Sequence, residues 1–429
     1  MIRKRLTGFK KRQVYVCLVN YTAIPSIKNM RMKKTIICLL VILFSEDCFS
    51  QTLSPGDQMP DISLPATLAG EPSRPVKKFR GKLLIIDFWA TWCSPCISSM
   101  KELEGYKSAL GDKLEVVAIS EEPAERLVRF NKARPSTLTL TSDTSGMLKS
   151  YFPHRTIPHT VLIGPEGKVY AITNADNISL DILKLALQGV AVNLPFKKDR
   201  VDFDIDEYLK ADSAKPEYFS LLPSVEGAGS MSKRYNTGIF KDRRLSIINM
   251  TLDGLFRLAY EKTFHLVINE YDTVKRSYAD MEKFSLDAWI EQPDKVKLML
   301  FIQQQLKKHF VDVEAVLEKR KQTVLLIKTN KDAISRLKPS SEKNDNFNAG
   351  GGHFEGNGVK LDALAEYMEG FGLFPGKVIN ETGLDGRYDI FFQWQPEKKD
   401  SLKDAFASLG LYYEKAEREV EVLVIKKKS

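Results

Sequence analysis

The sequence predicts an α/β domain followed by an α+β domain, and three observations lead to this fold class. Two apolar runs, residues 83–90 and 114–120, are rich in branched and aromatic residues, as expected of strands buried on both faces. Helical spacing of apolar residues follows each run, so strands and helices alternate. A polar, charged stretch at 193–216 then separates this part from a second half with its own pattern. The alternation predicts a mainly parallel sheet with helices on its faces.

The elements of the first half can be justified in chain order. Behind the strand at 83–90, apolar residues recur every three or four positions and predict a helix over 94–110. After the strand at 114–120 we expect a helix at 124–132, a strand at 137–140, a helix at 145–152, two strands around a Gly-Pro-Glu-Gly turn within 159–172, and a helix at 179–189 that ends on Gly.

The second half is predicted to consist of loosely repeated strand–helix units. Three segments share a Leu-x-x-Leu/Phe helical signature opened by a polar residue, and they lie at 249–261, 358–370 and 400–411. The composition of three further segments predicts a flexible loop at 341–352, a structural hairpin at 382–389 and a terminal strand at 420–428.

The N-terminal region has the order of a secretory signal peptide. Two lysines precede a ten-residue apolar run, Thr35 to Phe44, which is too short to span a bilayer, and a short polar stretch with a small residue follows. We therefore interpret residues 1–50 as a leader with the signal peptide at 33–50. This predicts a location in the periplasm or cell envelope, with a membrane tether if the signal is not removed. A lipoprotein attached through Cys48 is the alternative.

The positive net charge belongs to the leader. The chain has 64 Lys or Arg and 55 Asp or Glu, and the first fifty residues hold ten of the former and two of the latter. The remaining 54 basic and 53 acidic residues leave the rest of the chain near neutrality. The basic balance therefore gives no support for a nucleic-acid partner.

Only two of the five cysteines, Cys93 and Cys96, lie beyond the leader. A single C-x-x-C pair supplies two of the four ligands that a structural zinc ion needs, so a redox pair is favoured over a metal site. The pair begins a predicted helix, whose N-terminus stabilises a thiolate, and Pro95 suits its first turn. We expect Cys93 to be the exposed nucleophile and Cys96 the shielded resolving thiol.

Other residues near the pair are candidates for supporting roles. Trp89 and Trp92 can wall the site and limit water. Asp87 lies on the preceding strand, where burial would raise its pKa and make it an acid/base for Cys96; a merely buried, hydrogen-bonded carboxylate is the alternative. His159 is expected to be a solvated residue at the start of a strand rather than a substrate contact.

The segments "DFWATWCSPC" and "TIPHTVLIGPEGK" give the first half a resemblance to a known family. Together they resemble the exported TlpA/ResA-like thiol–disulfide oxidoreductases of the thioredoxin superfamily, over roughly residues 53–190. The resemblance implies a thioredoxin-like fold and a redox-active disulfide between Cys93 and Cys96 as the only redox group, without a further cofactor. It also implies a cis bond between Ile157 and Pro158 beside the pair, where the client backbone docks.

The same resemblance implies the partners and the remaining site residues. Trp92 and Pro95 join the Ile157–Pro158 pair as expected substrate-binding residues, and the partners are envelope client proteins with disulfides and an electron donor in the membrane. Two departures concern proton handling. Ser99 stands where many ResA-like members have an acidic residue, and Asp87 stands where many have Asn.

The second half resembles a domain family of uncharacterised function found in soil bacteria, and this likeness implies no chemistry. The predicted organisation is therefore a leader at 1–50, a thioredoxin-like domain at 51–192, a linker at 193–216 and an α+β domain at 217–429.

Two other functions stay open: an envelope adaptor whose second domain recognises a partner, and a copper-handling dithiol. Peroxiredoxin chemistry is disfavoured because Ala90 stands where Thr is expected.

Overall fold

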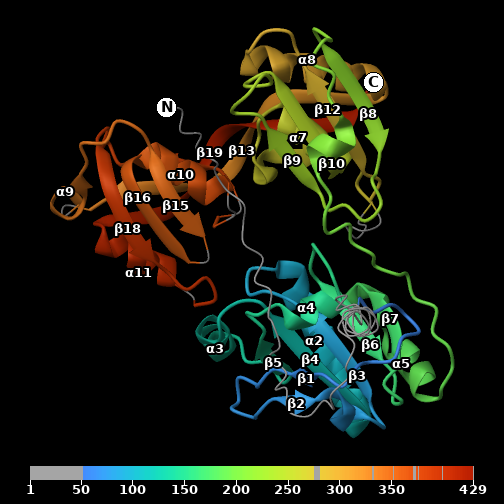
Figure 1. Ribbon diagram of the computed structural model, residues 1–429. Coiled ribbons are helices and arrows are strands. Elements are labelled where there is room, and N and C mark those ends of the chain that lie inside the picture. The colour runs from blue at the N-terminus through green and yellow to red at the C-terminus, as the bar shows by residue number, and fades with distance from the viewer. Residues whose placement is uncertain are drawn as a thin grey trace, which may run out of the picture. The chain divides into compact units, whose positions relative to one another are not determined.

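The computed structural model describes residues 52–274, 281–330, 333–350, 352–370, 373–374, 376–398 and 400–428 (Figure 1). The predicted signal peptide lies outside the described residues and stays a prediction. Within the described part of the chain, no helix combines the length and the apolar character that crossing a membrane requires.

The first half of the described chain is built on one five-stranded sheet with the strand order β5-β4-β3-β6-β7. Its strands are β3 (Leu83–Phe88), β4 (Leu114–Ser120), β5 (Thr139–Ser142), β6 (His159–Ile163) and β7 (Val169–Thr173). β3 runs parallel to β4, and β4 to β5, whereas β6 is antiparallel to both β3 and β7. The prediction of a mainly parallel sheet is therefore wrong for half of the pairings. The tight turn between β6 and β7 accounts for one of them, because a short turn joins antiparallel strands only.

Helices cover this sheet on both faces. They are α2 (Ser94–Leu110), α3 (Ala124–Ala133), α4 (Met147–Tyr151) and α5 (Leu180–Leu187), and two short strands, β1 (Ser63–Leu64) and β2 (Arg74–Pro75), precede them. Alternate residues of β3 point to opposite sides, as the strand period requires. Leu83 and Ile85 join the apolar cluster of α2, α3 and α5, whereas Leu84 and Ile86 join that of α4. The sheet is thus buried on both faces.

The second half is a mixed α+β region with three four-stranded sheets, ordered β8-β12-β10-β9, β11-β19-β13-β17 and β14-β18-β16-β15. Its strands are β8 (Tyr218–Pro223), β9 (Met231–Arg234), β10 (Arg244–Met250), β11 (Val267–Asn269), β12 (Phe284–Trp289), β13 (Val313–Thr329), β14 (Lys338–Pro339), β15 (Asn346–Gly350), β16 (His353–Lys360), β17 (Val378–Asn380), β18 (Arg387–Gln393) and β19 (Leu411–Lys427). Its helices are α6 (Ile205–Leu209), α7 (Leu252–Ala259), α8 (Lys295–His309), α9 (Ala333–Arg336), α10 (Leu361–Gly370) and α11 (Ser401–Ser408).

The two longest strands, β13 and β19, join the cores of this half. They pair antiparallel along 17 residues each. One end of the ribbon packs with α7 and α8, and the other end packs with α10 and α11. Five of the helices described in this half, α7 to α11, each lie between two consecutive strands in chain order, but whether these units are internal repeats stays a prediction.

Two predictions for the second half are wrong. The segment 341–352, expected to be a flexible loop, contains strand β15, which pairs with β16. The segment 382–389 is not a hairpin, because β17 and β18 belong to different sheets. Both segments are rich in polar and glycine residues, a composition typical of loops and turns. It hides the pairing of β15 with β16, the next strand along the chain, and it carries no information about the pairing of β17 with the distant strand β13.

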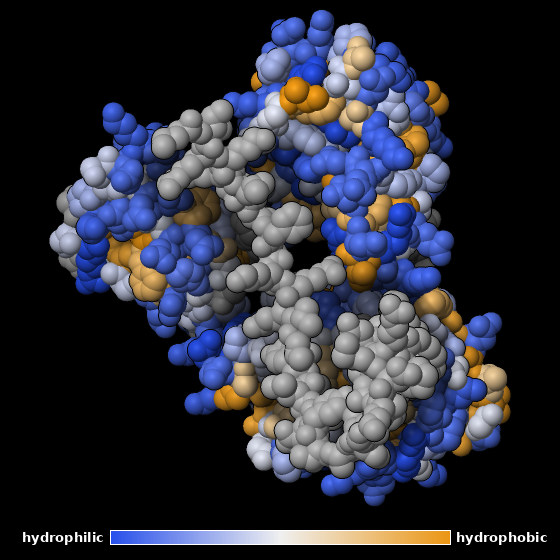
Figure 2. All heavy atoms as spheres, viewed as in Figure 1, coloured by the Kyte–Doolittle hydropathy of each residue, from blue (hydrophilic) through white to orange (hydrophobic). Residues whose placement is uncertain are grey.

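Figure 2 shows hydrophilic residues over most of the described surface on the viewed side, with hydrophobic residues in smaller groups between them.

Candidate active site

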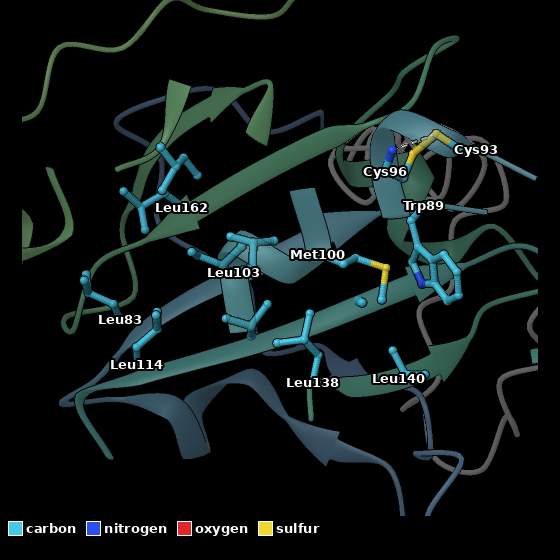
Figure 3. Close-up of a cluster of buried hydrophobic side chains, with 14 of the residues drawn as sticks. Leu83, Trp89, Cys93, Cys96, Met100, Leu103, Leu114, Leu138, Leu140 and Leu162 are labelled. Carbon is cyan, nitrogen blue, oxygen red and sulfur yellow. Dashed lines mark hydrogen bonds between the residues drawn. A yellow bond between two sulfur atoms is a disulfide. The ribbon is translucent and has the colours of Figure 1, made fainter. Parts of the chain in front are cut away.

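The cysteine pair lies at the junction between β3 and α2. Cys93 is the N-cap of α2, and its sulfur accepts a hydrogen bond of 3.3 Å from the backbone N–H of Cys96. Pro95 lies in the first turn of the helix. A disulfide joins Cys93 to Cys96, with 5.3 Å between their Cα atoms. Figure 3 shows this disulfide at the start of the helix, with Met100 further along it and Trp89 nearby.

The burial of the two sulfur-bearing residues differs less than expected. In this oxidised state Cys93 is 4% exposed and Cys96 is 0% exposed, so Cys93 is not an exposed tip. The two tryptophans behave differently from each other. Trp92 is 69% exposed beside the pair, whereas Trp89 is buried and packs on Phe130 with 5.2 Å between ring centroids. Trp92 therefore offers a surface ring, and Trp89 forms part of the core.

Asp87 is fully buried in β3. The hydroxyl of Thr160 donates a 2.6 Å hydrogen bond to Oδ1, whereas Oδ2 has no hydrogen-bond partner among the described residues. Burial raises the pKa of Asp87 to about 7, and the Thr160 hydrogen bond opposes part of this rise. Asp87 is two positions from Ile85, which packs in the same cluster as Cys93 and Cys96. By the strand period, the carboxyl therefore faces the side of the sheet that carries the pair.

The bond between Ile157 and Pro158 is cis, as the resemblance implies. It comes immediately before β6, which runs antiparallel to β3 with Phe88 opposite His159. The amino end of β6 and the carboxyl end of β3 consequently meet at one edge of the sheet. This topology brings the cis proline loop and the segment leading to Cys93 to the same edge.

His159 is not the solvated residue that the sequence suggests. It is 1% exposed and stacks on His154, with 4.5 Å between ring centroids. Burial, and then the charge of Lys197, lowers the pKa of His159 far below its usual range. No local pattern indicates this burial, since a histidine at the start of a strand is as readily placed outside a core as inside it.

A hollow of about 390 Å³ lies beside these elements. Its apolar lining comes from Phe88, Trp89, Ala90, Trp92, Ile119, Pro123 and Ile157, and its polar lining from Ser120, Glu121, Glu122, Lys149, His154 and Arg155. The hollow thus joins the segment before Cys93 to the cis proline loop. Its volume and its mixed apolar and polar lining suit a polypeptide side chain next to a disulfide.

Three residues that the sequence did not single out hold the loops of the site. Glu122, at the same sheet edge as the cysteine pair, accepts hydrogen bonds of 2.6 and 2.7 Å from the backbone N–H and hydroxyl of Thr91. Lys197 and Asp199 contact the residues on either side of the cis peptide. Glu122 could have been recognised from the sequence, because it is a carboxylate two residues beyond the end of a predicted strand. No local sequence feature indicates a role for Lys197 or Asp199.

Among the described residues, no group of three or more His, Cys, Asp and Glu is arranged to hold a metal ion.

In the comparison with known proteins, the two halves of the chain match two different families. The family model described as AhpC/TSA family matches residues 55–172, and that described as a protein of unknown function, DUF3738, matches residues 256–427. Thioredoxin-like protein YneN of Bacillus subtilis (strain 168) is 36% identical over 121 residues, which cover 27% of this chain and 69% of that protein. Thiol-disulfide oxidoreductase ResA of the same organism is 26% identical over 161 residues, covering 36% of this chain and 89% of ResA.

Solved structures are similar over the same part. The thioredoxin domain of a thiol-disulfide oxidoreductase from Bacteroides vulgatus is 26% identical, covers 32% of this chain and 99% of its own, and has a TM-score of 0.27. The pneumococcal exposed lipoprotein thioredoxin from Streptococcus pneumoniae is 22% identical, covers 30% of this chain and all of its own, and also has a TM-score of 0.27.

The five-stranded sheet, the disulfide at the start of α2 and the similarity to YneN and ResA define a thiol–disulfide oxidoreductase of the thioredoxin type. The chain belongs to the thioredoxin-like family that includes YneN and is related to ResA, and its second half carries the DUF3738 domain. The resemblances found in the sequence are thereby confirmed for both halves.

Proposed function

We propose that this protein is an exported thiol–disulfide oxidoreductase that reduces or exchanges disulfides of client proteins in the cell envelope. The observation that carries the proposal is the Cys93–Cys96 disulfide at the N-terminus of α2, at the sheet edge that also bears the cis Ile157–Pro158 bond. A helix N-terminus favours a thiolate, and the cis proline loop at the same sheet edge gives a client segment a place to dock.

The proposed reaction begins with the reduced pair. The thiolate of Cys93, stabilised by the backbone N–H of Cys96, attacks one sulfur of a client disulfide. A bond forms between Cys93 and the client, and the other client sulfur leaves as a thiolate. Cys96 then loses its proton and attacks the sulfur of Cys93, which releases the second client thiolate. The client gains two electrons, and the protein is left with the observed disulfide.

Asp87 is proposed to accept the proton of Cys96 in the second step. Its carboxyl faces the side of the sheet that carries the pair, and its pKa of about 7 lets it take up and return a proton near neutral pH. The buried Oδ2, which has no partner among the described residues, is the atom available for this transfer.

The location and the partners are proposed from the sequence. The charged and apolar order of residues 33–50 supports export, and the absence of other cysteines after the leader fits a chain without a disulfide scaffold. Each reduction consumes two electrons, so the cycle requires a donor, which we place in the membrane. The clients are envelope proteins that expose a disulfide.

Trapping with a Cys96→Ser variant tests this proposal. The variant can form the bond between Cys93 and a client but cannot resolve it, so reduced variant added to an envelope extract should accumulate adducts that dithiothreitol releases. The matched control is the double variant with Cys93→Ser, which should trap nothing. Equal adduct formation by both variants, or none by either with disulfide-containing extract proteins present, would contradict the client-reducing function and favour the adaptor alternative.

A further inference from the structure

A short segment after α5 crosses the cis proline loop, and we name residues 196–200 the strap. It belongs to the stretch that the sequence predicts to be a linker. The backbone N–H of Lys197 donates a 2.8 Å hydrogen bond to the carbonyl of Ile172 in β7, which lies at the edge of the five-stranded sheet. The strap is therefore attached to the same sheet that carries the redox pair.

Asp199 holds the loop from one side. Its Oδ2 atom accepts hydrogen bonds from the backbone N–H of Arg155 at 2.8 Å, from the backbone N–H of Thr156 at 2.8 Å and from the Thr156 hydroxyl at 2.9 Å. Hydrogen bonds to a carboxylate are stronger than those between neutral groups. Burial acts to raise the pKa of Asp199, but the charge of Lys197 and these hydrogen bonds outweigh it and lower that pKa.

Lys197 holds the loop from the other side. Its Nζ atom donates to the carbonyl of Thr156 at 2.7 Å and contacts Nδ1 of His159 at 3.2 Å. It also pairs with Asp199 at 3.2 Å, and the two side chains are only 12% and 8% exposed. The ammonium group thus bridges the residue before Ile157 and the residue after Pro158.

We propose that Lys197 and Asp199 are positioning residues that hold the cis proline loop in the conformation that docks the backbone of a client. Both backbone polar groups of Thr156, the residue immediately before Ile157–Pro158, are bound by the strap. Without the strap, the half-buried N–H and carbonyl of Thr156 would lose these hydrogen-bond partners. The loop would then no longer be held in one conformation. The inference rests on the thiol–disulfide chemistry proposed above, and it concerns client binding rather than reactivity of the thiols.

Two assays of the full chain test this inference: steady-state reduction of insulin with dithiothreitol, and a single-turnover reaction of dithiodipyridine with pre-reduced protein from which dithiothreitol has been removed. Insulin presents a polypeptide backbone, whereas dithiodipyridine is a small disulfide that needs only the thiolate of Cys93. With dithiothreitol as reductant, Asp199→Ala and Lys197→Met should each raise the KM for insulin about tenfold, the loss expected for one charge-assisted hydrogen bond. The kcat should stay within about twofold, because an interaction present equally in the ground and transition states affects KM alone.

Two further sets of variants sharpen the test. Lys198→Met changes an exposed charge within the strap and Asp202→Ala one two residues beyond it, and both should leave the KM for insulin unchanged. Asp199→Glu keeps the carboxylate and should recover part of the loss. All variants should react with dithiodipyridine at the wild-type rate. An unchanged rate also shows that the cysteine pair is correctly folded in each variant.

The outcomes distinguish a failure of the positioning role from a failure of the proposed dithiol function. An unchanged KM for insulin in both strap variants, or an equal loss of rate with insulin and dithiodipyridine, would overturn the positioning role. Wild-type protein that reduces neither substrate would instead contradict the proposed dithiol function itself.

Discussion

Asp87 is an ionisable group placed where water does not reach it. Its carboxyl is fully buried, and the Thr160 hydroxyl is its only side-chain hydrogen-bond partner among the described residues. A buried carboxylate with one hydrogen bond is costly, and the raised pKa expresses that cost. The same property makes the group useful, because a carboxyl that titrates near neutral pH can take a proton and return it.

Asp87→Asn should slow the release of the client more than its attachment. Attack by Cys93 needs only a thiolate that the helix terminus already favours, whereas Cys96 must lose its proton in a dry environment. General-base assistance typically contributes about a hundredfold or more. Stopped-flow measurement with a client disulfide should show a normal first phase and a retarded second phase near neutral pH. Two unchanged phases would leave Asp87 as a structural carboxylate.

The same substitution should change how stability depends on pH. The unfolded carboxyl ionises above about pH 3.8, whereas the folded one keeps its proton up to about pH 7. In this window the folded state binds more protons, so the contribution of Asp87 falls as pH rises, by up to about 4 kcal/mol in total.

Urea unfolding of the oxidised protein at several pH values measures this effect. Asp87→Asn removes this titration, so the variant should gain stability relative to wild type as pH rises through the window. Taking the difference between the two proteins cancels the other titrating groups, including the buried His159. Parallel pH curves for the two proteins would show that the carboxyl is not held protonated in the folded state.

At the scale of elements, the sequence predicted best where the signal was local. The helix α2 and the strand β4 have the predicted bounds, because continuous apolar periodicity and a helix cap define them. The strand β15 was predicted as a loop because its segment is polar and glycine-rich, although its partner β16 follows directly in the chain. The connection between β17 and β18 was predicted as a hairpin, but β17 pairs with β13 and β18 pairs with β16, in different sheets. Pairing between strands is a property of the whole fold and leaves little trace in a glycine-rich segment.

The residues of the candidate site also differ in how well the sequence predicts them. The cysteine pair, Asp87 and the cis proline were predictable because they carry a motif. The strap was not, because Lys197 and Asp199 stand in a charged stretch typical of a solvated linker. Only the folded chain shows that these charges meet backbone groups of the cis proline loop.

The ribbon of β13 and β19 offers a matched pair of substitutions. Leu317 and Leu423 are opposite each other in the ribbon, but Leu317 is 45% exposed and Leu423 is 0% exposed. Leu423→Ala should cost about 2–5 kcal/mol because it leaves a cavity in the core of α7 and α8. Leu317→Ala should change stability by about 0.5 kcal/mol or less.

Urea unfolding followed by tryptophan fluorescence compares these two variants, and insulin reduction should persist in both. A similar loss of stability in the two would show that the ribbon is not packed as described.

At the scale of the whole molecule, the redox residues all belong to the first half, and the second half contains no cysteine. We therefore expect the predicted thioredoxin-like domain, residues 51–192, to fold and to keep dithiol activity by itself. The strap lies beyond that boundary. A fragment of residues 51–200 should reproduce the KM of the full chain for insulin, whereas the fragment of residues 51–192 should show a raised KM with an unchanged kcat.

Circular dichroism and insulin kinetics of the two fragments check this expectation. Failure of both fragments to fold would show that the two halves share a core, and equal KM values for both would remove the strap from client binding.

The central claim is that Cys93 and Cys96 form a working dithiol. Its most direct measurement is insulin reduction by the purified full chain with dithiothreitol, for wild type and for Cys93→Ser. The account predicts rapid reduction by wild type and only the background rate for the variant, because without Cys93 no bond to the client can form. A variant as active as wild type, or a wild type no faster than dithiothreitol alone, would contradict it.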